Sequence, residues 1–498
     1  MKQQPPSGAR PALLAGILTL AALARLALIG AESLWLDELL VVERISHPYR
    51  ELLGDWDSRR QGPLFTLLLK PWSELFGTSE FVLRIPSAFF GVVAVWATYA
   101  LGREWFSERT GLWAAFLLAI NPFAIHYSQD ARPYTLLMAA SLSSLVLMAR
   151  YARRPHWAIG AGYAACTLAA LYSHAFGLFL LPAQICAYAV ERLSGEGWPA
   201  GTDSNGREHF TLRRLRGPFL VWFGVVLAGY LPQGLVFAST FVRKLSEPEV
   251  AGAWLRPPEL ADLPRTLVRY FMTRAAAAGL LASLALLVLA WARERRVDAR
   301  PLLLVFNLGL WFVLVPWLVA RWITPIYGPR YTIAALAGVL LLAGHGLASA
   351  RVRLAVLVAA VWVAAHAFAL ADLYRFVDKD PWRQAASFLQ ANLDTGDLVA
   401  VAVVNTHQSH AVLHYLRAPE GVRVLLTGPD IDTASAISGH QRVCVLSGYG
   451  DVFDLRRRIR ESVEQRGDTL LVRYRPIREL RVNPNAFGIR PITIECYG

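Results

Sequence analysis

Long apolar runs, rather than alternating or one-sided patterns, occupy most of the chain up to residue 375. A helix needs about 20 apolar residues to cross the hydrocarbon core of a bilayer, and about eleven runs approach that length. They lie at residues 11–30, 84–101, 111–127, 133–150, 157–173, 175–190, 217–240, 272–291, 301–320, 331–349 and 353–372. The pattern therefore predicts a polytopic α-helical membrane protein with about eleven transmembrane helices.

The pattern changes after residue 375. An amphipathic helix opens at Asp380 and ends before Gly396. Strand-like runs and one charged helix follow, at residues 398–404, 422–426, 443–446, 469–474 and, for the helix, 451–466. This alternation predicts a transmembrane domain over residues 1–375 and a small soluble α/β domain over 376–498. The second domain has no glycine-rich phosphate loop, so we expect it to support or guide rather than catalyse.

Composition narrows the class of protein. The chain has 498 residues, of which 55% are hydrophobic and only 17% are charged. Soluble globular proteins average about 25% charged residues, so an ordinary cytosolic enzyme is excluded. The 50 Lys and Arg residues exceed the 37 Asp and Glu residues, which gives a net charge of +13. The arginines are spread over separate loops without a basic fold, so we expect no nucleic-acid partner.

The basic residues predict an orientation. Every second loop between the apolar runs is rich in arginine, beginning with the segment before residue 11. Cytoplasmic loops carry such an excess, so the N-terminus is predicted to be cytoplasmic. The loops at 31–83, 128–132, 241–271 and 321–330, together with residues 376–498, then lie outside. The alanine- and arginine-rich composition suggests a bacterium, so we expect a multi-pass protein of the bacterial cytoplasmic (inner) membrane.

The first apolar run has two interpretations. Its basic start and the small residues Gly30 and Ala31 are also typical of a cleaved signal peptide. The run is long, and the segment after it carries acidic residues that suggest chemistry. We therefore expect an uncleaved anchor.

Four cysteines are present. Cys166 and Cys186 fall in apolar runs, where packing roles are expected. Cys444 and Cys496 fall in the predicted outer domain, where oxidation is possible. Whether these two pair stays open from the sequence. No spacing typical of a zinc site occurs.

Acidic and basic residues gather in the predicted outer loops. Asp37 and Glu38 lie within two helical turns of the first run, and Asp130 and Arg132 lie in the very short second loop. Placing a carboxylate near the bilayer costs free energy, so carboxylates found there tend to have a function. The plainer interpretation is a pair of solvated surface turns. Two acidic loops on the same predicted face of the membrane, each with arginines, favour a functional site over solvated surface turns.

Two further outer loops carry cations and aromatics. Tyr327, Arg330 and Tyr331 lie where the tenth run begins, and Arg330 could equally extend to the membrane interface. Arg243 and Lys244 belong to the irregular basic loop at 241–271, which can lie on anionic membrane lipid or bind a phosphate.

This set of residues suits one reaction class. Transfer of a sugar from a polyprenyl phosphate needs a base to take the proton of the acceptor hydroxyl. It also needs cations to stabilise the departing lipid phosphate. Arginines can supply that charge in a water-poor cleft, so a divalent metal is not required, although the sequence leaves one open.

Several segments resemble family 39 of the glycosyltransferases, the protein O-mannosyltransferases and aminoarabinose transferases within the GT-C superfold. The matching segments are Ser33-Leu-Trp-Leu-Asp37-Glu38, Gly62-Pro63-Leu, Gly77-Thr-Ser-Glu80-Phe-Val-Leu-Arg84-Ile-Pro86, Asn121-Pro122-Phe, Tyr127-Ser-Gln-Asp130-Ala-Arg132-Pro-Tyr134 and Arg330-Tyr331. The resemblance is dense over residues 31–150 and sparse afterwards. It implies a GT-C fold and an inverting transfer of a hexose or pentose from a polyprenyl-phosphate-linked donor.

The resemblance also implies roles for residues. Asp37 would be the catalytic base, with Glu38 beside it, and Asp130 would position substrate or support the base. Substrate contacts are expected from Arg84, Arg132, Tyr134, Arg243, Lys244, Tyr327, Arg330 and Tyr331. Many relatives have a histidine before the Pro-Leu segment, where this chain has Gln61-Gly62-Pro63, so no role of that histidine transfers. The acceptor, whether a glycan, a lipid or a protein, stays open.

Two other functions are compatible with a polytopic chain. A transporter or flippase of lipid-linked saccharides usually shows internal repeats and ionisable residues near the bilayer midplane. No repeat is evident, and the acidic residues cluster in outer loops instead. A non-catalytic scaffold would depend on residues 376–498 and would tolerate changes at Asp37.

Overall fold

The computed structural model describes residues 9–54, 62–193, 219–246, 256–294, 298–375, 379–403, 409, 412–426, 431–448, 454–476 and 492–498. The chain forms two compact units. Unit 1 comprises residues 1–27, 53–65 and 85–369. Unit 2 comprises residues 28–52, 66–84 and 370–498. The units do not follow a linear division near residue 375, because unit 2 combines two early segments with the C-terminal part of the chain.

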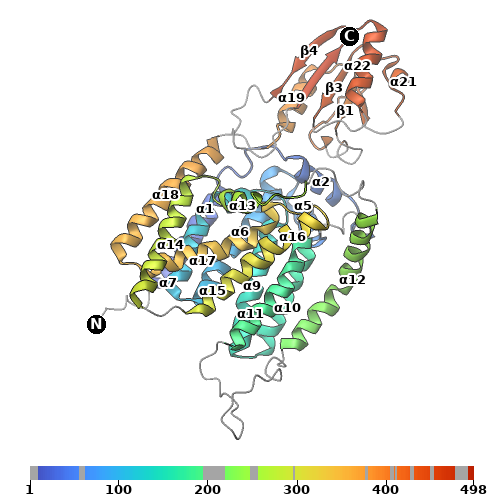
Figure 1. Ribbon diagram of the computed structural model, residues 1–498. Coiled ribbons are helices and arrows are strands. Elements are labelled where there is room, and N and C mark those ends of the chain that lie inside the picture. The colour runs from blue at the N-terminus through green and yellow to red at the C-terminus, as the bar shows by residue number, and fades with distance from the viewer. Residues whose placement is uncertain are drawn as a thin grey trace, which may run out of the picture. The chain divides into compact units, whose positions relative to one another are not determined.

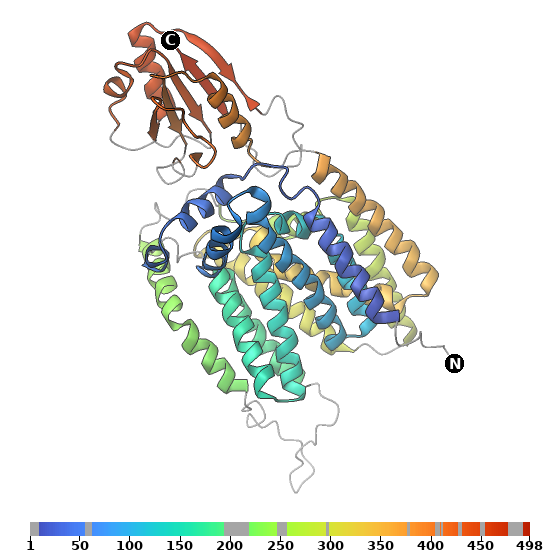
Figure 2. The same cartoon turned by 180° about the vertical axis from the view of Figure 1, so that it is seen from behind.

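Unit 1 is a bundle of helices (Figure 1). Its elements are α1 (Ala9–Leu26), most of α6 (Glu80–Trp105), α7 (Glu108–Ala119), α8 (Pro122–Ser128), α9 (Tyr134–Arg153), α10 (Trp157–Ser173), η1 (Ala175–Phe179), α11 (Leu180–Leu193), α12 (Phe219–Ser246), α13 (Asp262–Arg269), α14 (Ala275–Glu294), α15 (Ala299–Gly309), η4 (Leu310–Leu314), α16 (Val315–Trp322), η5 (Pro329–Thr332), α17 (Ile333–Ser349) and most of α18 (Val352–Arg375). The view from behind shows α1, in dark blue, along one side of this bundle (Figure 2).

The centre of unit 1 is built on α17. This helix packs against α7, α14 and α15, and most of its residues are buried. Its sequence consists mainly of alanine, leucine and glycine, whose small or flexible side chains allow neighbouring helices to approach closely. α9 is buried along most of its length and packs against α10 and α11.

Helix lengths support a multi-pass membrane protein. Among the residues that the structure describes, six helical segments are long and apolar enough to cross a membrane, or seven if the bent pair α7–α8 is one span. They are Glu80–Trp105, Tyr134–Arg153, Phe219–Ser239, Ala299–Trp322, Pro329–Ser349 and Val352–Arg375. The predicted count of about eleven is therefore not confirmed, because several predicted spans form shorter or bent helices, such as Ala278–Arg293.

Unit 2 contains a mixed sheet. Within the described residues its strands are β1 (Leu398–Ala402), β2 (Arg423–Leu426), β3 (Val443–Ser447), β4 (Leu470–Tyr474) and β5 (Thr493–Tyr497). The order is β2-β1-β3-β5-β4, parallel among the first three and antiparallel around β5. The predicted small C-terminal α/β domain is thus present. The last strand, β5, was missed in the sequence because Glu495 interrupts its short apolar pattern.

Among the residues that the structure describes, the helices beside this sheet are α19 (Trp382–Asn392), α21 (Thr433–Ile437) and α22 (Leu455–Arg466). Ile437 of α21 and Ile459 of α22 share a core with alternate residues of β1 and β3, so these two helices cover one face. Cys444 and Cys496 lie opposite each other in β3 and β5 and form a disulfide, with Cα atoms 4.0 Å apart. The pairing that the sequence left open is therefore made.

The early segments of unit 2 form short helices. They are α2 (Leu36–Ser46), α3 (Tyr49–Gly54), α5 (Leu64–Phe76) and the first turn of α6. α2 carries the predicted acidic pair, and α6 continues into unit 1.

Candidate active site

The predicted acidic pair Asp37 and Glu38 lies in the first turn of α2, in unit 2. Negative side chains are favoured there because the N-terminal N–H groups of a helix carry a partial positive charge. Glu38 accepts a hydrogen bond from the Trp35 backbone N–H at 3.2 Å, which closes the turn. Glu38 is fully buried, whereas Asp37 is partly exposed. Asp37 is therefore the carboxylate of this pair that a substrate can reach.

Two cations surround the buried Glu38 carboxylate. Arg84 donates from Nε and Nη2 to its two oxygens, each at 2.8 Å, and Lys379 Nζ donates to Oε2 at 3.1 Å. The other Arg84 N–H groups donate to three backbone carbonyls between residues 29 and 33. All five Arg84 donors are thus engaged. This geometry favours a structural role for Arg84, holding the segment before α2, over the substrate contact expected from the sequence.

The second predicted acidic loop is a tight turn between α8 and α9 in unit 1. Asp130 is only 1% exposed, and its carbonyl accepts a hydrogen bond from the Arg132 N–H at 2.7 Å. Ser87 of α6 donates through its hydroxyl to the Arg132 carbonyl at 3.2 Å. The Ser87 carbonyl accepts a hydrogen bond from the Thr135 hydroxyl at 2.9 Å. α6 therefore fixes the end of this turn that carries Arg132 and leads into α9.

Arg132 and Arg330 lie over the same tyrosine ring. Each guanidinium carbon is 5.8 Å from the centre of the Tyr134 ring, and Arg330 is 5.1 Å from the centre of the Tyr331 ring. His174 stacks on Tyr331 with ring centres 4.9 Å apart. We call these five residues the aromatic–arginine cluster. Three turns that are far apart in the sequence supply it, and all belong to unit 1.

Asp130 lies beside this cluster. Tyr127 packs edge-to-face on Tyr134, with ring centres 5.3 Å apart. The same Tyr127 interacts electrostatically with both Asp130 and Arg330. The cluster with its neighbour Asp130 thus holds two guanidinium groups and one carboxylate, which leaves an excess of positive charge.

His174 adds no charge to the cluster near neutral pH. Burial, and secondly the guanidinium groups of Arg132 and Arg330, lower the pKa of His174 to about 3. Its Nδ1 accepts a hydrogen bond from the Phe176 backbone N–H at 3.1 Å, which caps η1. A neutral imidazole is the form that can act as this acceptor.

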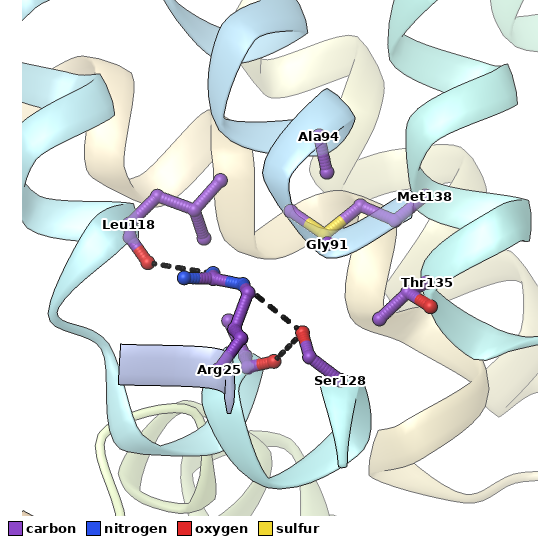
Figure 3. Close-up of a pocket in the computed structure, with 8 residues that line it drawn as sticks. Arg25, Gly91, Ala94, Leu118, Ser128, Thr135 and Met138 are labelled. Atoms are coloured by element: carbon purple, nitrogen blue, oxygen red, sulfur yellow. Dashed lines mark hydrogen bonds between the residues drawn. The ribbon is translucent and has the colours of Figure 1, made fainter. Parts of the chain in front are cut away.

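A buried arginine holds the break between α7 and α8, whose axes differ by 62° (Figure 3). Arg25 of α1 is 1% exposed and donates to the carbonyls of Leu118 and Ala119 at the end of α7, both at 3.2 Å. Its Nε donates to Ser128 Oγ in α8 at 3.1 Å. Carbonyls at a helix end have no partner within the helix, so Arg25 satisfies groups that the break exposes.

The same arginine connects α1 to the acidic turn. The Gln129 side chain donates to the carbonyls of Arg25 and Ala27, at 3.1 and 2.7 Å. Gly91 of α6 leaves the room for this contact, because a Cβ there would lie 2.3 Å from Ser128 Oγ and 2.7 Å from Arg25 Nε. A small pocket between these groups is lined by Arg25, Gly91, Ala94, Leu118, Ala124, Ser128, Thr135 and Met138 (Figure 3).

Gly62 stands next to the place where many relatives are expected to carry a histidine. Its φ is +95°, a conformation that residues with a Cβ rarely adopt. A Cβ there would also lie 2.6 Å from the backbone of Tyr172 and Ser173, directly before His174. Only glycine fits this approach to the end of α10.

The three remaining predicted substrate residues are not members of the aromatic–arginine cluster. Tyr327 is 7% exposed, and its hydroxyl forms a hydrogen bond with Thr266 Oγ1 at 2.7 Å, outside the aromatic–arginine cluster. Arg243 and Lys244 fall within the last turns of α12, but their side chains lie outside the described residues. Substrate contact by these three residues therefore stays a prediction.

Sequence reasoning brought together Arg132, Tyr134, Arg330 and Tyr331, but it missed their neighbour His174. The signal for His174 was its position between two apolar runs, at the same predicted side as the other turns. Lys379 and Arg25 were also missed. Lys379 lies at the predicted domain boundary without a motif, and Arg25 lies inside an apolar run, where an ionisable residue suggests a specific partner.

The described residues do not gather metal ligands. No group of three His, Cys, Asp or Glu side chains within them is arranged to hold a metal ion.

Comparison with known proteins identifies the fold. The chain matches the crystal structure of ArnT from Cupriavidus metallidurans in the apo state with a TM-score of 0.60 and 14% identity, over 98% of both chains. It matches ArnT of the same organism bound to undecaprenyl phosphate with a TM-score of 0.59 and 14% identity, over 99% of this chain and 98% of that one. The archaeal oligosaccharyltransferase AglB from Archaeoglobus fulgidus, in complex with an inhibitory peptide and a dolichol-phosphate, matches with a TM-score of 0.50 and 13% identity, over 88% and 69% of the two chains.

A comparison of the sequence with family models matches one segment of the chain. Residues 60–198 match the family model described as dolichyl-phosphate-mannose-protein mannosyltransferase. No curated protein matches the chain in sequence. The resemblance inferred from the motifs is thus confirmed at the level of the fold: this is a multi-pass membrane protein with the GT-C fold, and its residues 60–198 match the dolichyl-phosphate-mannose-protein mannosyltransferase model.

Proposed function

We propose that the protein is an inverting glycosyltransferase that moves a hexose or pentose from a polyprenyl-phosphate-linked donor to an acceptor. The acceptor is a glycan, a lipid or a protein hydroxyl at the outer face of the bacterial cytoplasmic membrane. Structures of the same fold that hold undecaprenyl phosphate or a dolichol-phosphate support a lipid-linked donor.

The aromatic–arginine cluster carries the proposal. Two guanidinium groups lie 5.8 Å from the centre of one buried tyrosine ring, where their charges repel each other in a poorly solvated setting. A phosphate between them relieves this repulsion, and guanidinium groups bind phosphate oxygens in pairs. Arg132 and Arg330 would stabilise the charge that develops on the leaving lipid phosphate. The rings of Tyr134 and Tyr331 would exclude water from it.

The carboxylates would take the acid–base role. Asp37 is the proposed base that removes the proton of the acceptor hydroxyl as that oxygen attacks the sugar carbon. Glu38, buried beside it, would keep the first turn of α2 in place. Asp130 would orient the turn that presents Arg132. Tyr327, Arg243 and Lys244 stay proposed contacts of the donor.

The disulfide supports the proposed sidedness. Cys444 and Cys496 are bonded in unit 2, and disulfides persist in oxidising compartments outside the bacterial cytoplasm. The arginine-rich alternate loops predict the same orientation from independent residues.

Substitution of Asp37 by Asn tests the proposed base. Since general bases contribute about 10²–10⁴-fold to a rate, we expect kcat to fall by at least about 100-fold in the purified protein in detergent. The assay follows label from a polyprenyl-phosphate-linked sugar into an extract of cell-envelope acceptors.

Asp298→Asn is the matched control. Asp298 caps α15 by accepting a hydrogen bond from the Arg300 N–H at 3.0 Å, and Asn retains that cap. This variant should keep wild-type activity. Full activity of the Asp37 variant would refute the proposed base. Translocation of lipid-linked sugar in vesicles, without net transfer in detergent, would instead favour a flippase.

A further inference from the structure

Glu38, next to the proposed base, is held from three separate parts of the chain. Its Oε2 accepts hydrogen bonds from Trp35 N–H at 3.2 Å, Arg84 Nη2 at 2.8 Å and Lys379 Nζ at 3.1 Å. Lys379 is 341 residues away in sequence and is only 7% exposed. The C-terminal part of the chain therefore contacts the first turn of α2 directly, within unit 2.

Tyr415 makes a second attachment just before α2. Its hydroxyl accepts a hydrogen bond from the Leu34 backbone N–H at 2.8 Å and donates one to Glu80 Oε1 at 2.8 Å. Arg383 pairs with the same Glu80 oxygen at 3.1 Å. Tyr415 therefore connects the segment that enters α2 with the start of α6.

Asp37 lies between these two attachments, three residues after Leu34 and one before Glu38. A shift of Leu34, just before α2, or of Glu38, in its first turn, moves the Asp37 backbone with it. A displacement of about 1 Å in a reacting group can cost about 100-fold in rate. The position of Asp37 is therefore sensitive to contacts that the C-terminal part of the chain supplies.

We infer that Lys379 and Tyr415 are positioning residues for Asp37, so that the C-terminal domain is part of the catalytic apparatus and not an appended module. Neither residue acts on substrate. Lys379 fixes Glu38, and Tyr415 fixes Leu34. The inference rests on the proposed function only for the role of Asp37.

The test compares three variants of the full-length protein. Lys379→Met and Tyr415→Phe each remove one attachment while keeping most of the side-chain volume. Lys70→Met is the matched control, because Lys70 is also 7% exposed and donates to the Ile45 carbonyl at the other end of α2, at 2.8 Å. Each variant is measured for kcat, for the KM of the donor, for thermal stability and for amide exchange over residues 31–39.

Lys379→Met should lower kcat by about 10- to 100-fold with the KM of the donor within about threefold. Amide exchange over residues 31–39 should become faster. Tyr415→Phe should lower kcat about tenfold and speed exchange at the Leu34 amide about fivefold, since that amide loses its acceptor. Lys70→Met should lose stability but retain kcat within about threefold.

Two outcomes would overturn the inference. One is unchanged kcat and unchanged exchange over residues 31–39 in Tyr415→Phe, the variant that loses a single oxygen and is least prone to misfold. The other is an equal loss of kcat in Lys70→Met, which would indicate general destabilisation.

Failure of the proposed function gives a different result. If Asp37→Asn retains full activity, the base is wrong whatever the positioning variants do. If Asp37→Asn is inactive and Tyr415→Phe is unchanged in rate and exchange, only the positioning role is wrong. Amide exchange reports on the attachments without any assay of activity.

Discussion

At the scale of single residues, two arginine side chains lie where the desolvation of their charge costs free energy. Arg132 is 7% exposed, yet it shares the ring of Tyr134 with Arg330. Cations over aromatic faces gain an attraction that offsets part of their desolvation. That gain does not remove the repulsion between the two guanidinium groups, so the proposed phosphate would bind more tightly there than at one arginine.

We predict that Arg132→Gln and Arg330→Gln each lower kcat/KM for the lipid-linked donor by about 10- to 100-fold, the worth of a charge-assisted hydrogen bond. Lysine in either place should restore part of the loss, because it retains the charge without the paired donors. Steady-state transfer kinetics measure this. Arg321→Gln, an exposed arginine at the end of α16, is the control. Equal kinetics of all three variants would contradict the phosphate role.

His174 gives a prediction about pH. An unfolded histidine takes up a proton near pH 6.5, whereas the pKa of His174 in the folded protein is about 3. Between these values the unfolded chain binds the additional proton, so stability is lost as the pH falls from about 6.5 towards 3. His174→Asn retains an acceptor for the Phe176 N–H but does not titrate.

Thermal unfolding in detergent at pH 7.5 and pH 5 measures this effect. The wild type should lose more stability on acidification than His174→Asn does, and the two should differ least at the higher pH. The same pH dependence in both proteins would show that His174 already takes up a proton in the folded state in this range.

At the scale of elements, the break between α7 and α8 determines where the acidic turn lies. Asn121 caps α8 by accepting a hydrogen bond from the Ala124 N–H at 2.9 Å, and Pro122 follows in the first turn. These two residues stop α7 and restart the chain at a 62° angle. Arg25 then binds the carbonyls at the break, and the new helix ends directly before Gln129-Asp130.

Gly91→Ala tests this element. The new Cβ would lie 2.3 Å from Ser128 Oγ, so α6 and α8 must separate or Arg25 must leave its partners. Overpacking of this kind costs about 1–3 kcal/mol, and we expect both a lower melting temperature and reduced transfer. Gly16→Ala in α1 is the control, because nothing lies within 4 Å of its added Cβ. A variant at Gly91 as stable and active as the control would contradict the packing described.

The sequence predicted the elements well where the pattern is local. Apolar runs located the helices of the bundle, and strand-like runs located β1 to β4. The bend at Asn121-Pro122 lies inside one apolar run and was missed, because a hydropathy pattern does not show where a helix changes direction. A shorter helix such as α10, with 17 residues, likewise appears as a full span in hydropathy.

The residues of the site were predicted unevenly for the same reason. Arg132 and Arg330 occur in recognisable turns, so their types and positions were sufficient. Lys379 contacts Glu38 of α2, and Tyr415 contacts Leu34 just before this helix, across 341 and 381 residues of sequence. Such contacts depend on tertiary packing, and neither residue lies in a local pattern that indicates a partner.

At the scale of the whole molecule, the Cys444–Cys496 disulfide bears on the proposed outer location of unit 2 and on the stability of that unit. It closes a loop of 52 residues, and cross-links of that span contribute about 4 kcal/mol in the chain-entropy account. Both cysteines lie in the sheet of unit 2, beside the core shared with α22.

We predict that Cys444→Ser/Cys496→Ser lowers the unfolding free energy of unit 2 by about 2–4 kcal/mol. Chemical denaturation followed by limited proteolysis of the full-length protein measures the change. In wild-type protein isolated from native membranes, peptide mapping without reductant should recover the two cysteines joined. Free thiols at both positions would contradict the proposed outer location.

The position of β5 has a consequence for the order of assembly. β5 lies between β3 and β4, although residues 493–497 are made after every other strand. During synthesis the sheet therefore stays open, with β4 lacking its neighbour, until residues 493–497 have been made. A nascent protein inserted up to α18 would carry its arginines and its acidic turn, but the sheet of unit 2 would still be incomplete. The sheet is therefore completed only when β5 inserts between β3 and β4.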